Sequence, residues 1–298
     1  MKKRLLSCCA SDIAKMSSAD LKNAIIASEG RTILGETIVT AAPLLEGVTN
    51  PEVMTAFGAD MIVLNEYDVF SRYINGMEGE NDPIEKLKRY TGRPIGINLE
   101  PVDPDAEGLV DLNVLPKGRC ATKETFLEAQ RQHIDFINLT GNPSTGVTNQ
   151  SICKAVKIAK EYFNGLIFAG KMHGAGVNED VLSEEYLLKF IEFGADGILI
   201  PAVGTVPGVN EADASSIVKK AKALGAITIS ATGTSQESAD PDTIRAFGLS
   251  NKRIGVDIHH LGDGGFGKMT DPENYMALSN CIRGKRHTYT RMSLSINR

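Results

Sequence analysis

Two stretches of the chain are nearly the same: AFGADMIVL at residues 56–64 and EFGADGILI at residues 192–200. In each, the pattern of a helix end is followed by a glycine and then by an apolar run that contains β-branched residues. Glycine suits the left-handed backbone position that follows a helix, and continuous apolar runs are typical of parallel strands that are buried on both faces. Each stretch therefore predicts a junction between a helix and a buried parallel strand.

The same pattern recurs along the chain, with amphipathic helical stretches between the apolar runs. Strand–helix alternation repeated about eight times over about 250 residues is typical of a (β/α)8 TIM barrel. A doubly wound open sheet is the alternative, but it prefers a GxGxxG turn after its first strand, and the sequence there is AAPLLEGVTN at residues 41–50. We therefore expect an α/β protein with strands at 37–42, 61–66, 94–100, 135–140, 166–172, 197–201, 227–231 and 254–259.

The sequence contains no linker or low-complexity tract and predicts one domain over residues 1–298. Residues 1–35 should form an N-terminal helical extension, because Ser17–Asp20 has a capping-box pattern. Residues 36–282 should form the barrel, and residues 283–298 a basic C-terminal tail that is either solvated or forms a cationic rim over an anionic ligand, in the same chain or a partner subunit. The cations of this tail are Arg283, Lys285, Arg286, His287, Arg291 and Arg298.

The composition excludes several classes of protein. A net charge of −5 and a pI near 5.6 argue against a nucleic-acid-binding protein. The five cysteines are odd in number and form no CxxC pair, which favours reduced thiols. Polar Ser7 and Asp12 interrupt the N-terminal apolar run, which is too short for a signal peptide, and no run approaches the ~20 residues of a membrane helix. We expect a cytoplasmic homo-oligomer that contacts neither nucleic acid nor membrane.

The active site of such a barrel lies at the C-terminal ends of its strands, and alternate strand residues face inward. Reading the strand ends in this way places many polar side chains on the inward face. Burying each one unpaired would cost about 1–3 kcal/mol, so their number indicates a functional pocket. The residues are Asn65, Asn98, Glu100, Asn138, Lys171, His173, Ser230, Asp257 and His259, with Glu66 and Asp68 as the alternative to Asn65.

Four of these side chains are candidates for catalysis. His173 and His259 suit acid–base chemistry because imidazole titrates near neutral pH, and Glu100 is a further proton carrier. Lys171 would hold an anionic group as a point charge, with a Schiff base or extension into solvent as alternatives. The substrate would bind to the remaining polar set: Asn65, Asn98, Asn138, Ser230 and Asp257.

A divalent metal such as Mg²⁺ is an open alternative. Carboxylates and imidazoles suit metal ions, but no HxH or HExxH spacing supports a protein-bound metal. The candidate ligands are Glu66, Glu100, His173, Asp257 and His259.

Two loops predict a phosphate site. TGTSQES at residues 232–238 follows the expected seventh strand, and LGDGGFG at 261–267 follows the eighth. Phosphate sites of TIM barrels are frequently built from these two loops, whose glycines expose backbone N–H groups. Asp263 would repel an anion, so we expect it to point away or to bind a cation. The expected phosphate contacts are Gly233, Thr234, Ser235, Gly264 and Gly265.

Two resemblances extend this interpretation. APLLEGVTNPEV at residues 42–53 resembles the first strand end of flavin-dependent barrels such as dihydrouridine synthases and nitronate monooxygenases, which implies a bound FMN. The overall layout, with its GAD strand entries, is similar to the BtpA-like and phosphoenolpyruvate-mutase-like barrels of an uncharacterised bacterial group. That similarity implies acidic magnesium ligands after the early strands, for which Glu66, Asp68 and Glu100 are candidates.

Together these features predict an enzyme that acts on a small phosphorylated or carboxylated metabolite. A lyase or isomerase with acid–base catalysis at the C-terminal face of the barrel is the favoured reaction type. An FMN-dependent oxidoreductase and a non-catalytic phosphometabolite-binding protein are the two alternatives.

Overall fold

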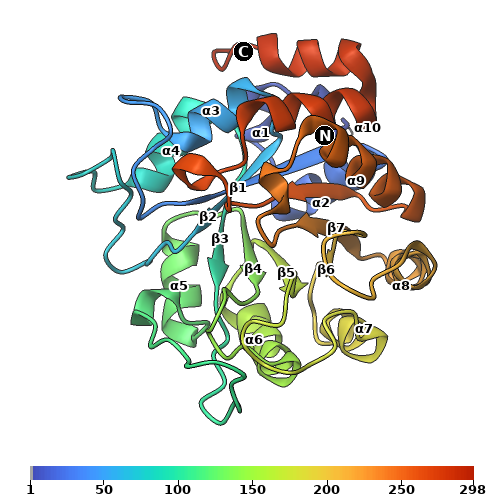
Figure 1. Cartoon of the computed structure of the whole chain (residues 1–298). Helices are drawn as coiled ribbons and strands as arrows, with labels where there is room; N and C mark the ends of the chain where they lie inside the picture. The colour runs from blue at the N-terminus through green and yellow to red at the C-terminus, as the bar shows by residue number, and fades with distance from the viewer. Residues whose placement is uncertain (1–2) are drawn as a thin grey trace.

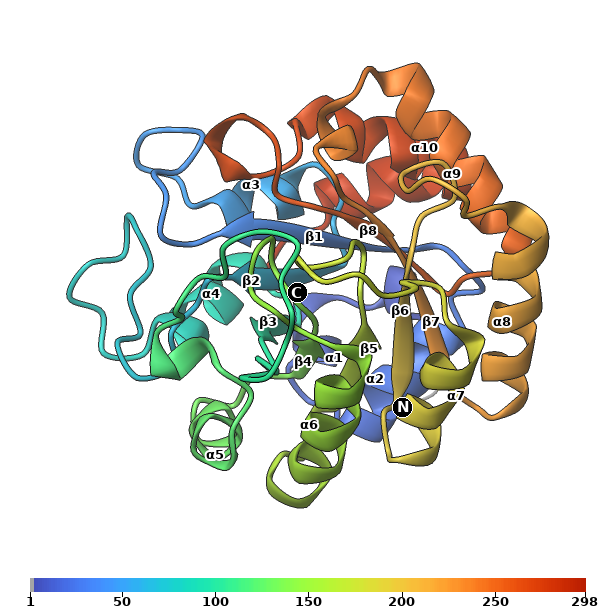
Figure 2. The same cartoon turned by 60° about the horizontal axis from the view of Figure 1, so that its bottom comes forward.

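The computed structural model describes residues 3–298 and contains a closed barrel in which each strand pairs in parallel with its sequence neighbours. Helices surround the strands on all sides (Figures 1 and 2). The predicted (β/α)8 barrel is confirmed. Its strands are β1 (Thr32–Ile38), β2 (Met61–Asn65), β3 (Ile95–Leu99), β4 (Phe136–Leu139), β5 (Leu166–Gly170), β6 (Gly197–Pro201), β7 (Ile227–Thr232) and β8 (Ile258–Leu261).

The helices begin at side chains that accept hydrogen bonds from the backbone of the first turn. Asp82 and Asp240 cap helices that have proline in the first turn, and Thr49 closes a capping box with Glu52. The α-helices are α1 (Ala10–Ile13), α2 (Ser18–Ile26), α3 (Asn50–Ala56), α4 (Pro83–Thr91), α5 (Lys123–Arg131), α6 (Asn149–Tyr162), α7 (Glu184–Glu192), α8 (Glu211–Ala223), α9 (Pro241–Ile254) and α10 (Pro272–Ser293).

The two similar stretches are the α3–β2 and α7–β6 junctions. Gly58 and Gly194 follow the two helices with φ values of 108° and 113°. A side chain at either position would be strained, which explains why glycine ends both helices.

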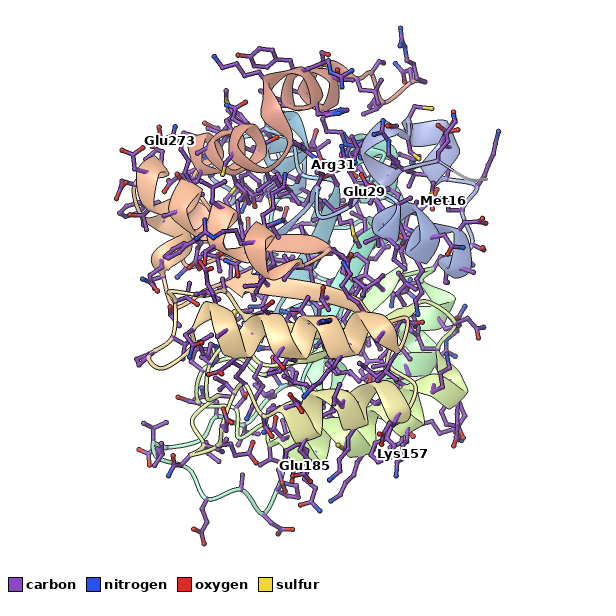
Figure 3. All side chains as sticks on the ribbon, turned by 90° about the vertical axis from the view of Figure 1, so that its right-hand side faces the viewer. Met16, Glu29, Arg31, Lys157, Glu185 and Glu273 are labelled. Atoms are coloured by element: carbon purple, nitrogen blue, oxygen red, sulfur yellow. The ribbon has the colours of Figure 1, made fainter. Side chains whose placement is uncertain are left out.

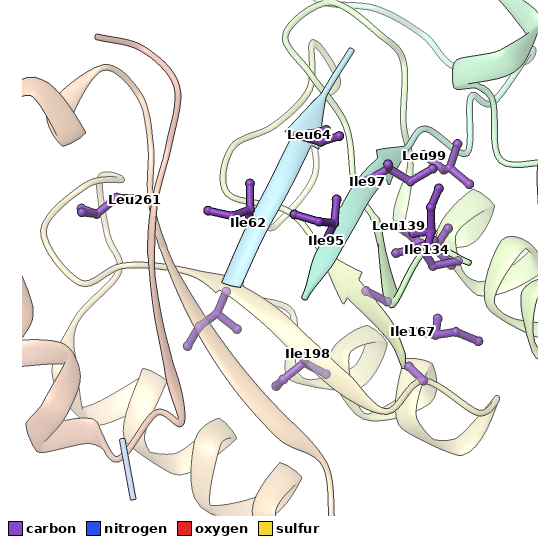
Figure 4. Close-up of a cluster of buried hydrophobic side chains, with 14 of the residues drawn as sticks. Ile62, Leu64, Ile95, Ile97, Leu99, Ile134, Leu139, Ile167, Ile198 and Leu261 are labelled. Carbon is purple, nitrogen blue, oxygen red and sulfur yellow. The ribbon is translucent and has the colours of Figure 1, made fainter. Parts of the chain in front are cut away.

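Strand alternation separates two apolar layers. Inward-facing residues such as Val63 and Ile229 fill the half of the barrel that is nearer the N-terminal ends of the strands. There the rings of Phe136 and Phe168 meet edge to face, with their centroids 5.8 Å apart. Gly96 leaves the space that the Phe136 ring occupies. Outward-facing residues pack between the strands and the helices (Figure 4), and they include Ile62, Leu64, Ile95, Ile97, Leu99, Ile167 and Ile198.

The first and last strands differ from the expected ranges. β1 begins at Thr32, not at residue 37, so Glu36 belongs to the strand. α9 continues to Ile254 and ends at Gly255, whose φ is 91°, so β8 begins only at Ile258. The expected range 254–259 is therefore wrong at both ends, with consequences for the site.

The N-terminal extension closes the bottom of the barrel. Leu21 and Ile25 of α2 and Leu5 join the apolar cluster inside the barrel, and Met16 packs against that cluster. Figure 3 shows Met16 beside the helices of the N-terminal extension, and also Glu29 and Arg31, which directly precede β1. The extension thus excludes water from the end of the barrel opposite the strand C-termini.

A buried ion cluster fixes α10 at this same N-terminal end. The Asp60 carboxylate, directly before β2, lies 2.6 Å from Arg283 and 2.7 Å from Arg291, and it accepts the Ile33 N–H at 2.9 Å. Burial disfavours the charged carboxylate, but the two arginines outweigh burial and hold the pKa of Asp60 below its usual value. Two cations of the basic tail thus lie at the barrel bottom and form no rim over the strand C-termini.

Among residues 3–298, no helix combines the length and the apolar character that a membrane span requires.

Replacing Asp60 with asparagine should destabilise the fold strongly. The substitution leaves Arg283 and Arg291 buried without their anion, and removing one partner of a buried ion pair costs about 3–5 kcal/mol. Urea unfolding followed by circular dichroism measures this loss. Glu184→Gln is the matched control, because the pair of Glu184 with Lys220 is exposed and should contribute less than about 1 kcal/mol. Equal losses in the two variants would contradict the role of Asp60.

Candidate functional site

A cavity of about 610 Å³ lies at the C-terminal ends of the strands. A larger cavity, of about 870 Å³, lies at the other end of the barrel, between the N-terminal extension, α4 and the start of β3. We place the candidate site in the smaller cavity, because catalytic residues of TIM barrels come from strand C-termini and because carboxyl groups from several strands converge only there among the described residues.

Glu36 of β1 is the deepest acidic residue of this cavity. Its side chain faces into the barrel, and the residue is 2% exposed. One carboxylate oxygen lies 2.7 Å from Nε2 of His260, off the direction of a linear hydrogen bond. The other accepts a hydrogen bond from Asn98, and Asn98 accepts one from Asn138 at 3.1 Å. The structure thus brings the predicted Asn98 and Asn138 together around a carboxylate that the sequence analysis did not include.

A second polar chain crosses the cavity. Asp263 Oδ2 accepts a hydrogen bond from Asn65 at 2.7 Å, and Asn65 exchanges two hydrogen bonds with Asn142. Asn142 donates to Glu100 at 2.8 Å, and Arg119 donates to the same carboxylate oxygen at 2.6 Å. Predicted residues from β2 and β3 are therefore linked through Asn142, which lies in the loop after β4.

Burial raises the pKa of two carboxyl groups in these polar chains. Burial, followed by the nearby charge of Glu36, raises the pKa of Asp263 well above its usual value, against the hydrogen bond from Asn65. Burial also raises the pKa of Glu100, although Arg119 opposes it. Such shifts are common where a protein positions proton donors, although buried ion pairs produce them too.

His173 lines the cavity as a neutral imidazole. Its Nδ1 accepts the backbone N–H of Ala175 at 3.0 Å, so the ring proton must lie on Nε2. Burial lowers the pKa of His173, and the nearby Glu36 partly opposes this change. The imidazole can therefore donate a hydrogen bond into the cavity.

The predicted Lys171 does not reach the cavity. β5 ends at Gly170, and the Lys171 ammonium lies 2.7 Å from Glu179 and 3.3 Å from the Val147 carbonyl. Glu179 also accepts the N–H of Asn149 at the start of α6. The pairing of Lys171 with His173 on one face was wrong, because the chain leaves the strand between them. In this position Lys171 connects the loops after β4 and β5.

His259, Asp257 and Ser230 also lie outside the cavity. His259 pairs with Ile33 in the β1–β8 register, and both belong to the outward face. Its Nε2 lies 3.2 Å from the Gly30 carbonyl oxygen. Asp257 binds Lys222 of α8 at 2.7 Å, and Ser230 lies between the inward-facing Ile229 and Ala231. The inward histidine of β8 is His260, so the expected orientation of both histidines was wrong.

The two glycine-containing loops line the cavity in a different way from that predicted. Gly233, Thr234 and Ser235 lie at its wall, and the last two have φ values of 60° and 67°. The Gly264 N–H donates to Glu237 Oε1 at 2.5 Å, so a carboxylate of the protein already occupies this donor. A Cβ at Gly265 would lie 2.1 Å from the Met269 carbonyl oxygen, so alanine there would disturb the loop.

These loops and acids do not fit an FMN phosphate or a Mg²⁺ ion. Glu237 and Asp263 would repel a phosphate at the glycine loops. Glu66 accepts a hydrogen bond from Thr40, Glu100 pairs with Arg119, and Asp68 caps backbone N–H groups of its own turn. Within residues 3–298, no three His, Cys, Asp or Glu side chains are arranged to hold a metal ion.

Four functional candidates were missed from the sequence: Glu36, Arg119, Glu237 and His260. Glu36 follows the apolar residues 33–34 at inward parity, and an earlier start of the first strand would have revealed it. Glu237 stands inside the TGTSQES loop that was considered only for its hydroxyls. Arg119 lies in the long segment between β3 and α5, where no periodic signal exists.

The comparisons with known proteins identify a family. The family model described as Domain of unknown function (DUF7916) matches residues 6–298. The chain belongs to this family. A search of the curated proteins gives no match.

Solved structures share the DUF7916 fold at low sequence identity. An archaeal fructose 1,6-bisphosphate aldolase is 13% identical with a TM-score of 0.52, covering 87% of this chain and 96% of its own. A 2,3-dimethylmalate lyase of the PEP mutase/isocitrate lyase superfamily is 11% identical with a TM-score of 0.51, covering 83% of this chain and 81% of its own. These similarities support the barrel fold.

Asp263→Asn should stabilise the protein increasingly as the pH rises. Because the folded-state pKa of Asp263 is raised, the folded state holds a proton that the unfolded state has already lost above about pH 4. The wild type therefore loses stability as the pH rises from there through the folded-state pKa, and asparagine does not. We expect a gain on the order of 1 kcal/mol at pH 8 and none at pH 3.5, measured by urea unfolding. A gain independent of pH would contradict this assignment.

His259 should make the fold sensitive to acid. Burial, the main cause, lowers the pKa of His259 to about 4 from 6.5. Neutral His259 makes its full contribution to the free energy of unfolding above pH 6.5. This contribution is lost as the pH falls from 6.5 through 4, by up to about 3 kcal/mol. Unfolding at pH 7 and pH 4 should show that His259→Gln, which keeps a side-chain N–H, loses less stability than the wild type over this interval. The same loss in both proteins would refute the assignment.

Proposed function

We propose that the protein is an enzyme that performs a lyase or isomerase reaction on a small phosphorylated or carboxylated metabolite. The observation that supports this proposal best is the convergence of Glu36, Glu237 and Asp263 with His173 and His260 at the C-terminal end of the barrel. Acid–base chemistry on a carbon acid needs one group that accepts a proton and another that supplies one.

The surroundings of the carboxyl groups suggest their roles. Glu36 has His260 at 2.7 Å as a partner for its negative charge, so it is the proposed base. Asp263 has an amide donor from Asn65 and acidic neighbours, which raise its pKa; it is the proposed acid. Two carboxyl groups whose surroundings differ in this way are a recurrent basis for acid–base pairs. His173 would donate its Nε2–H to the oxygen on which charge develops.

Two cations of the cavity wall are proposed to hold the anionic group of the substrate. Arg119 lies after β3 and has a buried Nε without a partner among the described residues. Lys268 lies before α10 and its side chain is exposed. A guanidinium matches the planar geometry of a carboxylate or phosphate. These side chains replace Lys171 and the glycine loops in our proposal.

The proposed chemistry can be tested by isotope exchange. Enzymatic removal of a proton next to a carbonyl group exchanges that proton for deuterium in D₂O, which proton NMR detects. A panel of phosphorylated and carboxylated metabolites incubated with the protein should contain at least one that exchanges. Glu36→Gln should slow this exchange at least about 100-fold, the usual contribution of a general base.

The neighbouring residues His259 and His260 provide a matched pair of variants for this exchange experiment. His260→Gln should slow the exchange, while His259→Gln, outside the cavity, should leave it unchanged. Ligand binding without exchange or product would indicate a metabolite-binding protein, and loss of exchange in His259→Gln alone would reverse the assignment.

A further inference from the structure

We infer that the substrate of this site carries a protonated amine, which binds at the Glu237–Asp263 wall of the cavity, together with an anionic group that binds at Arg119 and Lys268. This inference rests on the proposed function and specifies its substrate class: an amino acid, an amino sugar phosphate or a similar zwitterion.

The charges of the cavity wall are unbalanced. Four carboxyl side chains line it, those of Glu36, Glu66, Glu237 and Asp263, against two permanent cations, Arg119 and Lys268. Arg119 already lies 2.6 Å from Glu100 and 3.7 Å from Glu66. Arg119 is thus engaged by Glu100 and Glu66, and neither Glu237 nor Asp263 has an ion-pair partner among the described residues.

Unpartnered acceptors at the wall of the cavity point to a ligand that donates hydrogen bonds. Glu237 is 2% exposed; its Oε1 accepts the Gly264 N–H, and its Oε2 has no partner. Thr140 is also 2% exposed and lines the cavity with an unpartnered hydroxyl. A buried acceptor without a donor costs about 1–3 kcal/mol. An ammonium group supplies three N–H donors and a positive charge at once.

A metal ion matches this wall less well than an ammonium group. A Ca²⁺ ion needs six to eight oxygen ligands at short distances, and residues 3–298 provide no group of three side chains that could hold a metal ion. An ammonium group binds through individual hydrogen bonds and tolerates the spread arrangement of Glu237, Asp263 and Glu36.

Binding of a cation should release protons from the protein. Burial raises the pKa of Glu237 and Asp263, and the charge of Glu36 raises both further. A positive charge beside Glu237 reverses this effect, so Glu237 loses its bound proton when the amine binds. Asp263 keeps the proton that it supplies as the proposed acid. The groups that face them are Glu36, Glu66, His173, His260, Lys268 and Tyr275.

Matched ligand pairs test the inference on the full-length protein. The pairs are O-phosphoserine with 3-phosphoglycerate, aspartate with malate, and glucosamine 6-phosphate with glucose 6-phosphate, which differ in one amine or hydroxyl group. Titration calorimetry in two buffers of different ionisation enthalpy gives affinity and proton release together. We expect at least one amine to bind tenfold or more tightly than its hydroxyl partner at pH 7, with protons released.

Variants locate the effect. Glu237→Gln and, independently, Asp263→Asn should each reduce the preference for the amine at least fivefold without weakening the hydroxyl partner. Glu273→Gln is the control, because Glu273 lies on the outer surface (Figure 3) and should change nothing. Circular dichroism establishes that each variant is folded, and either cavity variant alone suffices for the test.

Several results would overturn the inference: hydroxyl ligands that bind as tightly as the amines, amine binding without proton release, or no binding in any pair. Binding of Mg²⁺ or Mn²⁺ alone with proton release would assign the wall to a metal instead. Deuterium exchange with a hydroxyl ligand would leave the proposed function standing while this inference fails. A preference for amines without any deuterium exchange would support this inference and contradict the proposed function.

Discussion

The buried carboxylate of Glu36 imposes the arrangement of the upper barrel. A carboxylate inside a protein is costly unless cations or hydrogen-bond donors surround it. His260 and Asn98 supply these contacts from β8 and β3, and Asn98 in turn binds Asn138 of β4. The upper interior is therefore polar, whereas the layers below it contain apolar side chains.

The two ends of the barrel differ in how well their buried charges are compensated. At the N-terminal end, one carboxylate, Asp60, is held between Arg283 and Arg291, so its charge is compensated by two permanent cations. At the C-terminal end, carboxyl groups exceed cations, and the raised pKa values of Asp263 and Glu237 show that their ionisation is unfavourable. Functional sites commonly carry such destabilisation, which the rest of the fold offsets.

The barrel could be predicted from the sequence because its signal is repeated. Amphipathic helices and apolar strands alternate along the chain, and several of the helices end at glycine, so an error in one unit does not change the fold. The site depends instead on single residues. The inward face of β8 was assigned wrongly, which exchanged the roles of His259 and His260, since adjacent strand residues face opposite ways. The same error affected β5, where Leu166 and Phe168 point inward and Lys171 therefore lies at outward parity. A strand that is buried on both faces is apolar throughout, so its sequence does not reveal which face points inward. Arg119 ends a short 3-10 helix, Lys117–Arg119, in the long segment between β3 and α5, which shows no periodic apolar pattern.

The Asp60 cluster also has a consequence for synthesis of the chain. Asp60 and Arg283 are 223 residues apart in sequence, and at 5–20 residues per second the ribosome needs roughly 10–45 s to reach the arginine after the aspartate. During that interval the carboxylate, which belongs at the entry to β2, lacks both of its principal counterions. Burial of Asp60 is therefore unfavourable before α10 emerges, and the first strands should remain exposed to water until then. Closure of the barrel and docking of α10 should then be late, coupled events in folding.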